Sequence, residues 1–308
     1  MPVPGSPYKC ERGEVQGIFR LLVPLGVELL MLSALEQRIR EHDNDRFLTS
    51  LFAPESARAD LYVLYAFNLE LAKLRETISE ALIGRMRLQF WRDAISAIAD
   101  GKEPPQHEVA VPLAGLIARF PGLSEDLLTL INGREVDLDD EPPLDMKAFE
   151  TYAEATSSAL LRASARVLEQ SPDGVADLTR HAGIAIATVG AVRALPYQVT
   201  IGRVTIPADL CRAVGLDPMT PSQWPKDLDF RPLSLPLLDL ADRHIRAARS
   251  SSQRAAKKAM SPFLMLSLAA LYHNRLRSAG GDPLALVARP PGVARPWTVL
   301  AASLKGRP

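Results

Sequence analysis

An all-α, single-domain fold is predicted by three features of this sequence. From Leu35 onward, apolar residues recur every three or four positions in long segments, which is the spacing of one helix face. Most of these segments are bounded by proline, glycine or serine, the residues that start, cap or interrupt helices. No set of alternating apolar and polar runs predicts a sheet, and the best strand candidate, residues 199–207, stands alone. We therefore expect one helical bundle.

The first two long helices are expected at residues 55–79 and 81–100. Pro54 precedes the first helix, and Gly101 follows the second as a C-cap. The apolar face of the second helix is expected to contain Leu82, Met86, Phe90, Ala94, Ile95 and Ile98. Further helical segments are expected at residues 109–120, 124–138, 147–170, 174–195, 234–260 and 261–280.

Composition excludes several classes of function. Lys+Arg and Asp+Glu number 36 each, so the formal net charge is zero and gives no general attraction to nucleic acid. Aromatic residues make up only 6%, too few to indicate base-stacking surfaces. The two cysteines, Cys10 and Cys211, form no metal-binding or disulfide pattern. We expect a reducing, cytoplasmic compartment and no nucleic-acid partner.

The N-terminal residues are treated apart from the helical domain. Residues 21–35 are apolar but contain Pro24 and Glu28, and the run is shorter than the ~20 residues of a membrane-spanning helix. No signal-peptide pattern accompanies it. We expect residues 1–34 to be a poorly ordered extension or the product of an upstream start, with Met31 as the native start codon. The alternative is a short apolar anchor. Residues 35–308 would then form the domain.

The segment 181–195 is rich in small residues. Small side chains on a central helix let a neighbouring backbone approach closely, which is the first interpretation. The second is that this helix lines an apolar tunnel, and both can hold in one fold. The residues concerned are Ala182, Gly183, Ala185, Ala187, Gly190 and Ala191.

The order of six segments resembles the squalene/phytoene synthase superfamily from about Asp45 to Ala285. These segments are LYAFNLE (64–70), RLQFWRDAI (87–95), YAEATSSALL (152–161), HAGIAIATVGAVR (181–193), GRVTIPADL (202–210) and LAALYHNRLRSAGGDPL (268–284). Residues 66–95, and REVDLDD (134–140) followed by YAEATSSALL, particularly resemble the branch of mitochondrial complex I assembly factor 6 and its alphaproteobacterial relatives. The resemblance implies an isoprenoid-synthase-like bundle with a central cavity.

The resemblance also implies a chemistry that these residues can be compared with. The enzymes of the superfamily join two prenyl diphosphates head to head. Mg²⁺ ions bridge the diphosphates to aspartates on two facing helices, because a leaving group with several negative charges needs hard cations and oxygen ligands. No cofactor is expected for this chain, and Mg²⁺ only if it is such an enzyme.

The acidic metal-binding positions of the enzymes are mostly not acidic in this chain. The resemblance places the first set on Ala72, Lys73 and Glu76, and the second on Ala194, Tyr197 and Gln198. Only Glu76 keeps a carboxylate. Pro196 is expected to end or kink the second motif helix. We therefore expect a retained fold without catalytic or metal-binding residues.

Other acidic and histidine residues give no replacement site. Glu70 and Lys73 suit ion pairing along one helix. The acidic run at residues 137–141 is expected at a solvated helix end, away from the motif helices, with a partner contact as the alternative. The five histidines show no metal-ligand spacing, and His181 is expected to be structural.

Cations near the motif segments suggest direct binding of an anion. If the carboxylates are absent, arginine and lysine can hold a prenyl diphosphate or a lipid head group without metal, although ordinary surface ion pairing is the first expectation. The ligand-binding candidates are Asn68, Glu70, Lys73, Glu76, Arg193, Tyr197 and Arg203. The basic segment 243–258 is interpreted either as a solvated helix face or as a membrane-surface patch.

Two functions from different classes follow. The first, implied by the branch resemblance, is a non-catalytic assembly factor that contacts complex I subunits or other assembly proteins. It would act in the cytoplasm, with peripheral contact at the inner membrane face, or on the matrix side of mitochondria. The alternative is an active head-to-head prenyl diphosphate synthase of squalene or phytoene type, which rests on the likeness of fold and segments.

Overall fold

Helices form all the regular secondary structure in the computed structural model, which describes residues 31–74, 80–139, 141–169, 171, 173–252 and 259–308. The predicted all-α class is confirmed, since no strand occurs in these ranges. The strand candidate at 199–207 was wrong. Its first two residues end a long helix, and the rest forms a turn and loop leading into the next helix.

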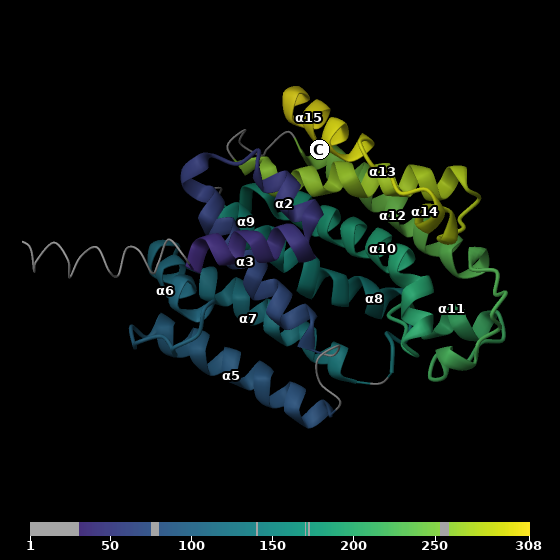
Figure 1. The fold of residues 1–308 in the computed structure, drawn as a ribbon, viewed down its shortest axis with the longest axis horizontal. Helices are drawn as coiled ribbons and strands as arrows, with labels where there is room; N and C mark the ends of the chain where they lie inside the picture. Colours follow the sequence, from purple (N-terminus) through teal and green to yellow (C-terminus); the bar gives the residue numbers. More distant parts are fainter. Residues whose placement is uncertain (1–30, 75–79, 140, 170, 172, 253–258) are drawn as a thin grey trace, which may run out of the picture.

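The N-terminal half surrounds one hydrophobic core (Figure 1). Residues 31–42 are helical and bury Leu35 and Ile39 completely or almost completely. Asp43 then starts the next helix, because its carboxylate accepts a hydrogen bond from the backbone N–H of Arg46 (3.3 Å). The helices of this half are α2 (Asn44–Ser50), α3 (Glu55–Ala72), α5 (Ala81–Ala99), α6 (Ala110–Arg119) and α7 (Leu123–Gly133).

The predicted boundary between extension and domain at residue 34 stays a prediction. Residues 1–30, which include most of the apolar run 21–35, lie outside the described residues. Residues 31–34 already belong to the first described helix, and Leu32 packs against the N-terminal core.

In the middle of the chain, two α-helices follow each other without a break, joined by one turn of π-helix. The 3₁₀ turn η1 (Arg134–Leu138) leads to α8 (Met146–Ala153), whose start is capped by Asp145 through the N–H of Ala148 (2.8 Å). A π-helical turn, η2 (Glu154–Ser158), joins α8 to α9 (Ala159–Val167). Such turns are rare and change which side chains face inward.

Helix α10 (Ala176–Thr200) runs through the centre of the molecule in Figure 1. It packs along α12 (Arg231–Ser251) and α13 (Leu264–Ser278), and it contributes to two of the three hydrophobic cores. Pro196 was expected to end or kink this helix; it does not end the helix, because α10 continues for four more residues. The remaining elements are η3 (Asp173–Val175), α11 (Ala208–Ala213), η4 (Pro221–Gln223), η7 (Ser261–Phe263), α14 (Leu284–Ala288) and α15 (Ala294–Lys305).

One helical stretch of the described chain, residues 173–200, is long and apolar enough to cross a membrane by length and composition. Half of its most apolar window is buried inside the fold. Its apolar character is accounted for by its place at the centre of the bundle, where α12 and α13 cover it.

The apolar face of α5 and the apolar side of the basic segment 243–258 differ from the prediction in their burial. Leu82 and Met86 on α5 are 64% and 65% exposed, whereas Leu88 and Ile95 on the same helix are fully buried. The part of the predicted apolar face that contains Leu82 and Met86 therefore packs against no hydrophobic core. Conversely, the apolar side of the basic segment 243–258 is core, since Ile245 and Ala248 are buried; residues 253–258 lie outside the described residues. The membrane-patch interpretation is wrong for that helix face.

The small residues of α10 allow close packing, as predicted, and they also border a cavity, although its lining is largely charged and polar and does not form the apolar tunnel that was predicted. At Gly183 an added Cβ would overlap the backbone and hydroxyl of Ser158 in η2, so the two segments touch backbone to backbone. At Gly190, two turns later, an added Cβ would meet no atom within 4 Å, because this position borders a cavity. The part of α10 around Gly183 is therefore closely packed, and the part around Gly190 faces an open volume.

Candidate functional site

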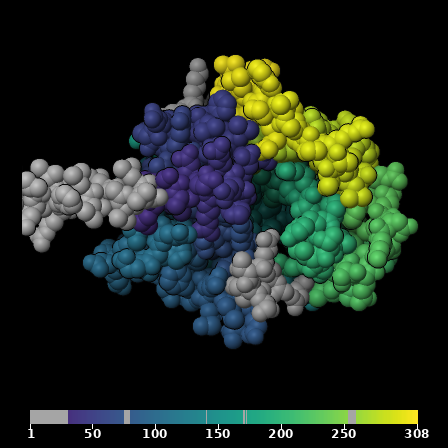
Figure 2. All heavy atoms as spheres, in the orientation of Figure 1, coloured from purple at the N-terminus to yellow at the C-terminus, as the bar shows by residue number. Residues whose placement is uncertain are grey.

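A cavity of about 850 Å³ lies beside the second half of α10. Figure 2 shows the molecule hollowed between the purple N-terminal helices, the teal-green α10 region and the yellow C-terminal segment. Small and apolar residues of α10 form one wall, including Ile186, Ala187, Gly190, Ala191 and Ala194. The charged and polar lining comprises Asp43, Asp45, Arg46, Asn68, Arg134, Asp137, Tyr152, Thr156, Ser157, Arg193, Tyr197, Gln198, Arg203 and Thr205.

Four of the seven ligand-binding candidates line this cavity, namely Asn68, Arg193, Tyr197 and Arg203. Glu70 and Lys73 are not among the described lining residues, and Glu70 forms an ion pair with Arg38 of the helix over 31–42. Glu76 lies outside the described residues. The positions where the resemblance places acidic ligands also converge here, except Lys73 and Glu76: the lining includes Ala72, Ala194, Tyr197 and Gln198.

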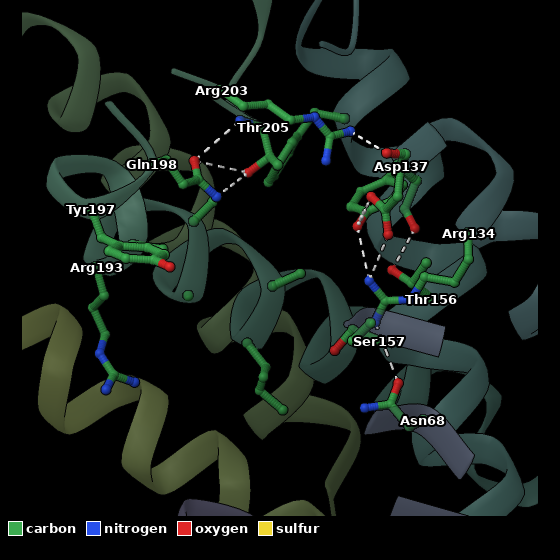
Figure 3. A pocket seen from close by; sticks show the side chains of 18 of the residues that line it. Asn68, Arg134, Asp137, Thr156, Ser157, Arg193, Tyr197, Gln198, Arg203 and Thr205 are labelled. Atoms are coloured by element: carbon green, nitrogen blue, oxygen red, sulfur yellow. Dashed lines mark hydrogen bonds and ion pairs between the residues drawn. The ribbon is translucent and has the colours of Figure 1, made fainter. Parts of the chain in front are cut away.

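Arg134 is the centre of a polar cluster on one side of the cavity (Figure 3). Its guanidinium donates to Asp137 (3.0 Å), to the Tyr152 hydroxyl (3.1 Å) and to Asn68 (3.3 Å). Burial works against the charge of Arg134, but Tyr152 and Asp137 outweigh it and raise the pKa of the guanidinium. Burial also raises the pKa of Tyr152. Arg134 therefore stays cationic at this wall.

Two buried polar atoms of this wall lack a hydrogen-bond partner. They are Nε of Arg134 and Oγ of Ser157, and both residues line the cavity. The π-helical turn η2 places Thr156 and Ser157 in this lining, next to the Arg134 cluster in Figure 3. Buried donors of this kind normally bind a protein group, water or a ligand.

The expectation that residues 137–141 lie away from the motif helices was wrong for Asp137. Its side chain accepts hydrogen bonds from Arg134 and Tyr152 (2.8 Å) inside the cavity wall, and its backbone carbonyl accepts from Arg203 (2.5 Å). A run of acidic residues usually faces solvent, but the η1 turn directs the carboxylate of Asp137 into the cavity wall. Residue 140 lies outside the described residues.

Gln198 braces the loop that follows α10. Its side-chain oxygen accepts from the N–H of Thr205 (3.1 Å), and its amide nitrogen donates to the Thr205 hydroxyl (2.9 Å). Gly202 adopts φ +75° at the turn between them, a conformation that favours glycine. The side chain at this position thus holds the wall of the cavity in place.

A second charged cluster surrounds Asp45. Its carboxylate accepts from the Tyr272 hydroxyl (2.9 Å) and pairs with Arg295 (2.5 Å) and Arg193 (3.5 Å). The Arg193 guanidinium also stacks 3.6 Å from the centre of the Tyr272 ring. Burial and Asp45 raise the pKa of Tyr272 to about 12. An adjoining cavity of about 530 Å³, beside residues 286–295, shares Gly190, Arg193 and Ala194 with the main cavity.

The described cavity residues, which do not include Glu76, do not fit a magnesium–diphosphate cluster. Of the described lining residues only Asp43, Asp45 and Asp137 carry carboxylates, and each is held by an arginine of the same chain. Among the residues that the structure describes, no three histidine, cysteine or carboxylate side chains converge as metal ligands. The four lining arginines, Arg46, Arg134, Arg193 and Arg203, instead suit an anionic group bound directly.

Comparison with known proteins accounts for this fold. The family described as squalene/phytoene synthase matches the chain over residues 39–297. The chain belongs to the squalene/phytoene synthase family. The solved structure of a dehydrosqualene synthase in complex with ligand superposes with a TM-score of 0.73 at 16% identity, covering 92% of this chain and 98% of that one. The isoprenoid-synthase-like bundle is thereby confirmed.

Relatives within the squalene/phytoene synthase family carry two kinds of name. Complex I assembly factor 6 of Homo sapiens is 32% identical over 231 residues, covering 73% of this chain and 68% of that protein. The protein from Bos taurus with the same name is 30% identical over 249 residues, covering 79% and 73%. Presqualene diphosphate synthase of Rhodopseudomonas palustris is 26% identical over 207 residues, covering 67% and 73%. The predicted resemblance to the assembly-factor branch is confirmed.

A histidine pair joins α10 to α12 on the side of the bundle near α8. The Nδ1 atoms of His181 and His244 lie 2.9 Å apart, so one ring must donate and the other accept. Nε2 of His244 is 3.6 Å from a carboxylate oxygen of Glu150. Desolvation, the nearby His181 and Arg180 lower the pKa of His244 to about 4, and desolvation also lowers that of His181. His181 is thus hydrogen-bonded, as expected for a structural histidine.

This histidine pair is expected to make stability fall in mild acid. The unfolded chain takes up these protons near pH 6.5, whereas folded His244 resists protonation down to about pH 4. The pair is therefore fully stabilising above about pH 6.5, and on the order of 2–3 kcal/mol is lost as the pH falls toward 4. Urea unfolding across this range measures the effect. An equally steep fall in a His244→Met variant would show that other groups cause it.

Proposed function

We propose that this member of the squalene/phytoene synthase family is a non-catalytic assembly factor for respiratory complex I, whose cavity binds an anionic prenyl or lipid ligand. The observation that carries the proposal is the cavity lining, in which Ala72, Ala194, Tyr197 and Gln198 stand at four positions that the resemblance assigns to acidic ligands. The relatives named complex I assembly factor 6 support the assembly role.

The partners of such a factor would be complex I subunits or other assembly proteins. The proposed place of action is the cytoplasmic face of a bacterial inner membrane, or the matrix side in mitochondria. No cofactor is proposed, and Mg²⁺ would be needed only by the enzymatic alternative.

The ligand class follows from the two walls of the cavity. The arginine side offers guanidinium groups, with Nε of Arg134 and Oγ of Ser157 as buried groups that have no partner in the structure. Guanidinium groups and hydroxyls are the donors that bind anionic oxygens directly. The opposite wall, around Gly190 and Ala194 of α10, is small and apolar and leaves room for a hydrocarbon chain. A prenyl diphosphate or a phospholipid unites these two features.

The assembly role is tested in cells that lack this protein. We expect the deletion strain to lose assembled NADH dehydrogenase on native gels and to recover it with the native chain. A Gly190→Leu variant fills the cavity without meeting another atom at Cβ, and we expect it to fold but to restore assembly poorly. Gly115→Leu, at an equally open but exposed position of α6, is the matched control. Normal complex I in the deletion strain would refute the proposal.

The alternative function, an active head-to-head prenyl diphosphate synthase, is supported by the relative named presqualene diphosphate synthase. Incubation of the purified protein with Mg²⁺ and farnesyl or geranylgeranyl diphosphate distinguishes the two. We expect no squalene, phytoene or cyclopropyl diphosphate product. Turnover that Mg²⁺ supports would establish the synthase and remove the non-catalytic assignment.

A further inference from the structure

The C-terminal helix α15 (Ala294–Lys305) exposes a continuous apolar stripe. Val293, Trp297 and Leu304 are 78%, 67% and 81% exposed, and Leu300 lies between them at 36%. Their spacing of four, three and four residues places all of them on one side of the helix. The opposite side is already used, since Val299 and Ala302 are buried in the core that α10, α12 and α13 share. The exposed stripe is therefore not required by the packing of α15.

The charge of this segment has one sign. Residues 284–308 contain Arg289, Arg295, Lys305 and Arg307 but no aspartate or glutamate. Arg295 is turned inward to Asp45. The other three side chains belong to exposed residues, and the described part of the chain provides no ion pair for them. Exposed cations thus border an exposed apolar stripe, with tryptophan in it.

Helix α5 provides a useful contrast. It too exposes apolar residues, Leu82 and Met86, and it lies at the opposite edge of the molecule from α15 in Figure 1. Two of its cations are neutralised within the chain, because Arg85 pairs with Asp139 (3.2 Å) and Arg92 with Glu135 (2.5 Å), whereas the exposed Arg87 has no ion pair among the described residues. The α15 segment differs from α5 because it carries three exposed cations without an ion pair among the described residues, and because its exposed apolar stripe contains a tryptophan.

We infer that α15 and the residues just before it dock on an anionic phospholipid surface. Tryptophan at a membrane interface places its apolar ring among the acyl chains and its N–H near the head groups. Arginine and lysine add attraction to anionic lipid within a Debye length of the surface. A protein partner with an acidic groove is the competing occupant, and it would not be mimicked by pure lipid.

Docking in this way would bring the adjoining cavity to the lipid. Residues Leu286, Val287 and Pro290, which precede α15, line the 530 Å³ cavity, and Arg193 lines both this cavity and the main one. The surface inference stands apart from the assembly role, because it is tested with purified protein and lipid alone.

Intrinsic tryptophan fluorescence measures the docking of α15 on lipid directly. The chain has three tryptophans; Trp91 and Trp224 are buried, and Trp297 is 67% exposed. We expect vesicles containing phosphatidylglycerol or cardiolipin to shift the emission to shorter wavelength and to protect it from iodide. Vesicles of phosphatidylcholine alone should have little effect, and high salt should reverse the change. Absence of any shift or co-sedimentation with anionic vesicles would overturn the inference.

Variants locate the surface. Trp297→Ser with Leu304→Ser should lower vesicle partitioning in sedimentation about tenfold or more, and Lys305→Gln with Arg307→Gln should lower it about tenfold on anionic vesicles alone. The matched control is Leu82→Ser with Met86→Ser, which removes equally exposed apolar residues from α5. Loss of binding in the α5 variant, with binding kept in the α15 variants, would assign the contact to α5 and overturn the inference.

Discussion

A Gly183→Ala substitution is expected to destabilise the protein by about 3 kcal/mol or more, because the new methyl group would occupy the position of Ser158 backbone atoms. A flexible side chain could move aside, but here the helix α10 and the turn η2 would have to separate. Because η2 also carries Thr156 and Ser157 into the cavity wall, we expect ligand binding to weaken as well. Urea unfolding followed by circular dichroism measures the loss.

Gly190→Ala is the control for this prediction on the same helix. Its Cβ meets no atom within 4 Å, so the substitution should keep or raise stability by up to ~1 kcal/mol through the better helix propensity of alanine. Equal stability of the two alanine variants would contradict the close backbone contact at Gly183. A large loss at both positions would contradict the open volume at Gly190.

The second large effect is expected for Arg134→Met. The substitution leaves Asp137 as a buried carboxylate that has lost its ion pair, and it removes hydrogen bonds to Tyr152 and Asn68. Breaking a buried pair in this way costs about 3–5 kcal/mol. The variant should also bind a prenyl diphosphate or anionic lipid more weakly in calorimetry, since the guanidinium lines the cavity.

The effect of Arg134→Met on folding stability must be distinguished from its effect on anion binding. A double variant, Arg134→Met with Asp137→Leu, removes both charges and should recover part of the stability but none of the anion binding. Arg85→Met is the surface control, because its pair with Asp139 is more than half exposed on both sides and contributes about 0–1 kcal/mol. Anion binding that survives in the double variant would exclude Arg134 as a ligand-binding residue.

The helices that sequence periodicity predicted best are those that face a core along their length. A helix was expected over residues 55–79, of which 75–79 lie outside the described residues, and α3 forms over 55–72 and buries Leu61 to Leu69 and Leu71. Periodicity failed at Leu82 and Met86, because it reports that one side of a helix is apolar, but not whether another element covers that side. Local proline chemistry allowed either an end or a kink at Pro196, and the structure excludes the end, because α10 continues to Thr200.

The candidate site was predicted only in part. Asn68, Arg193, Tyr197 and Arg203 were found through the resemblance and do line the cavity. Arg134 and Asp137 were missed, because they come from a 3₁₀ turn far along the chain from the motif helices, within a run that looks solvated. The only available signal was the segment REVDLDD, which the resemblance had marked without assigning a role.

The sequence by itself determined the all-α class and the family, since both depend on residue identity and local order. The tertiary structure decided which side chains meet. Hydrogen bonds such as those from Arg134 to Asn68 join residues 66 positions apart, and no local pattern encodes such a pairing. It also decided that Gly183 is packed while Gly190 is open, because the same residue type allows either a close contact or an empty volume.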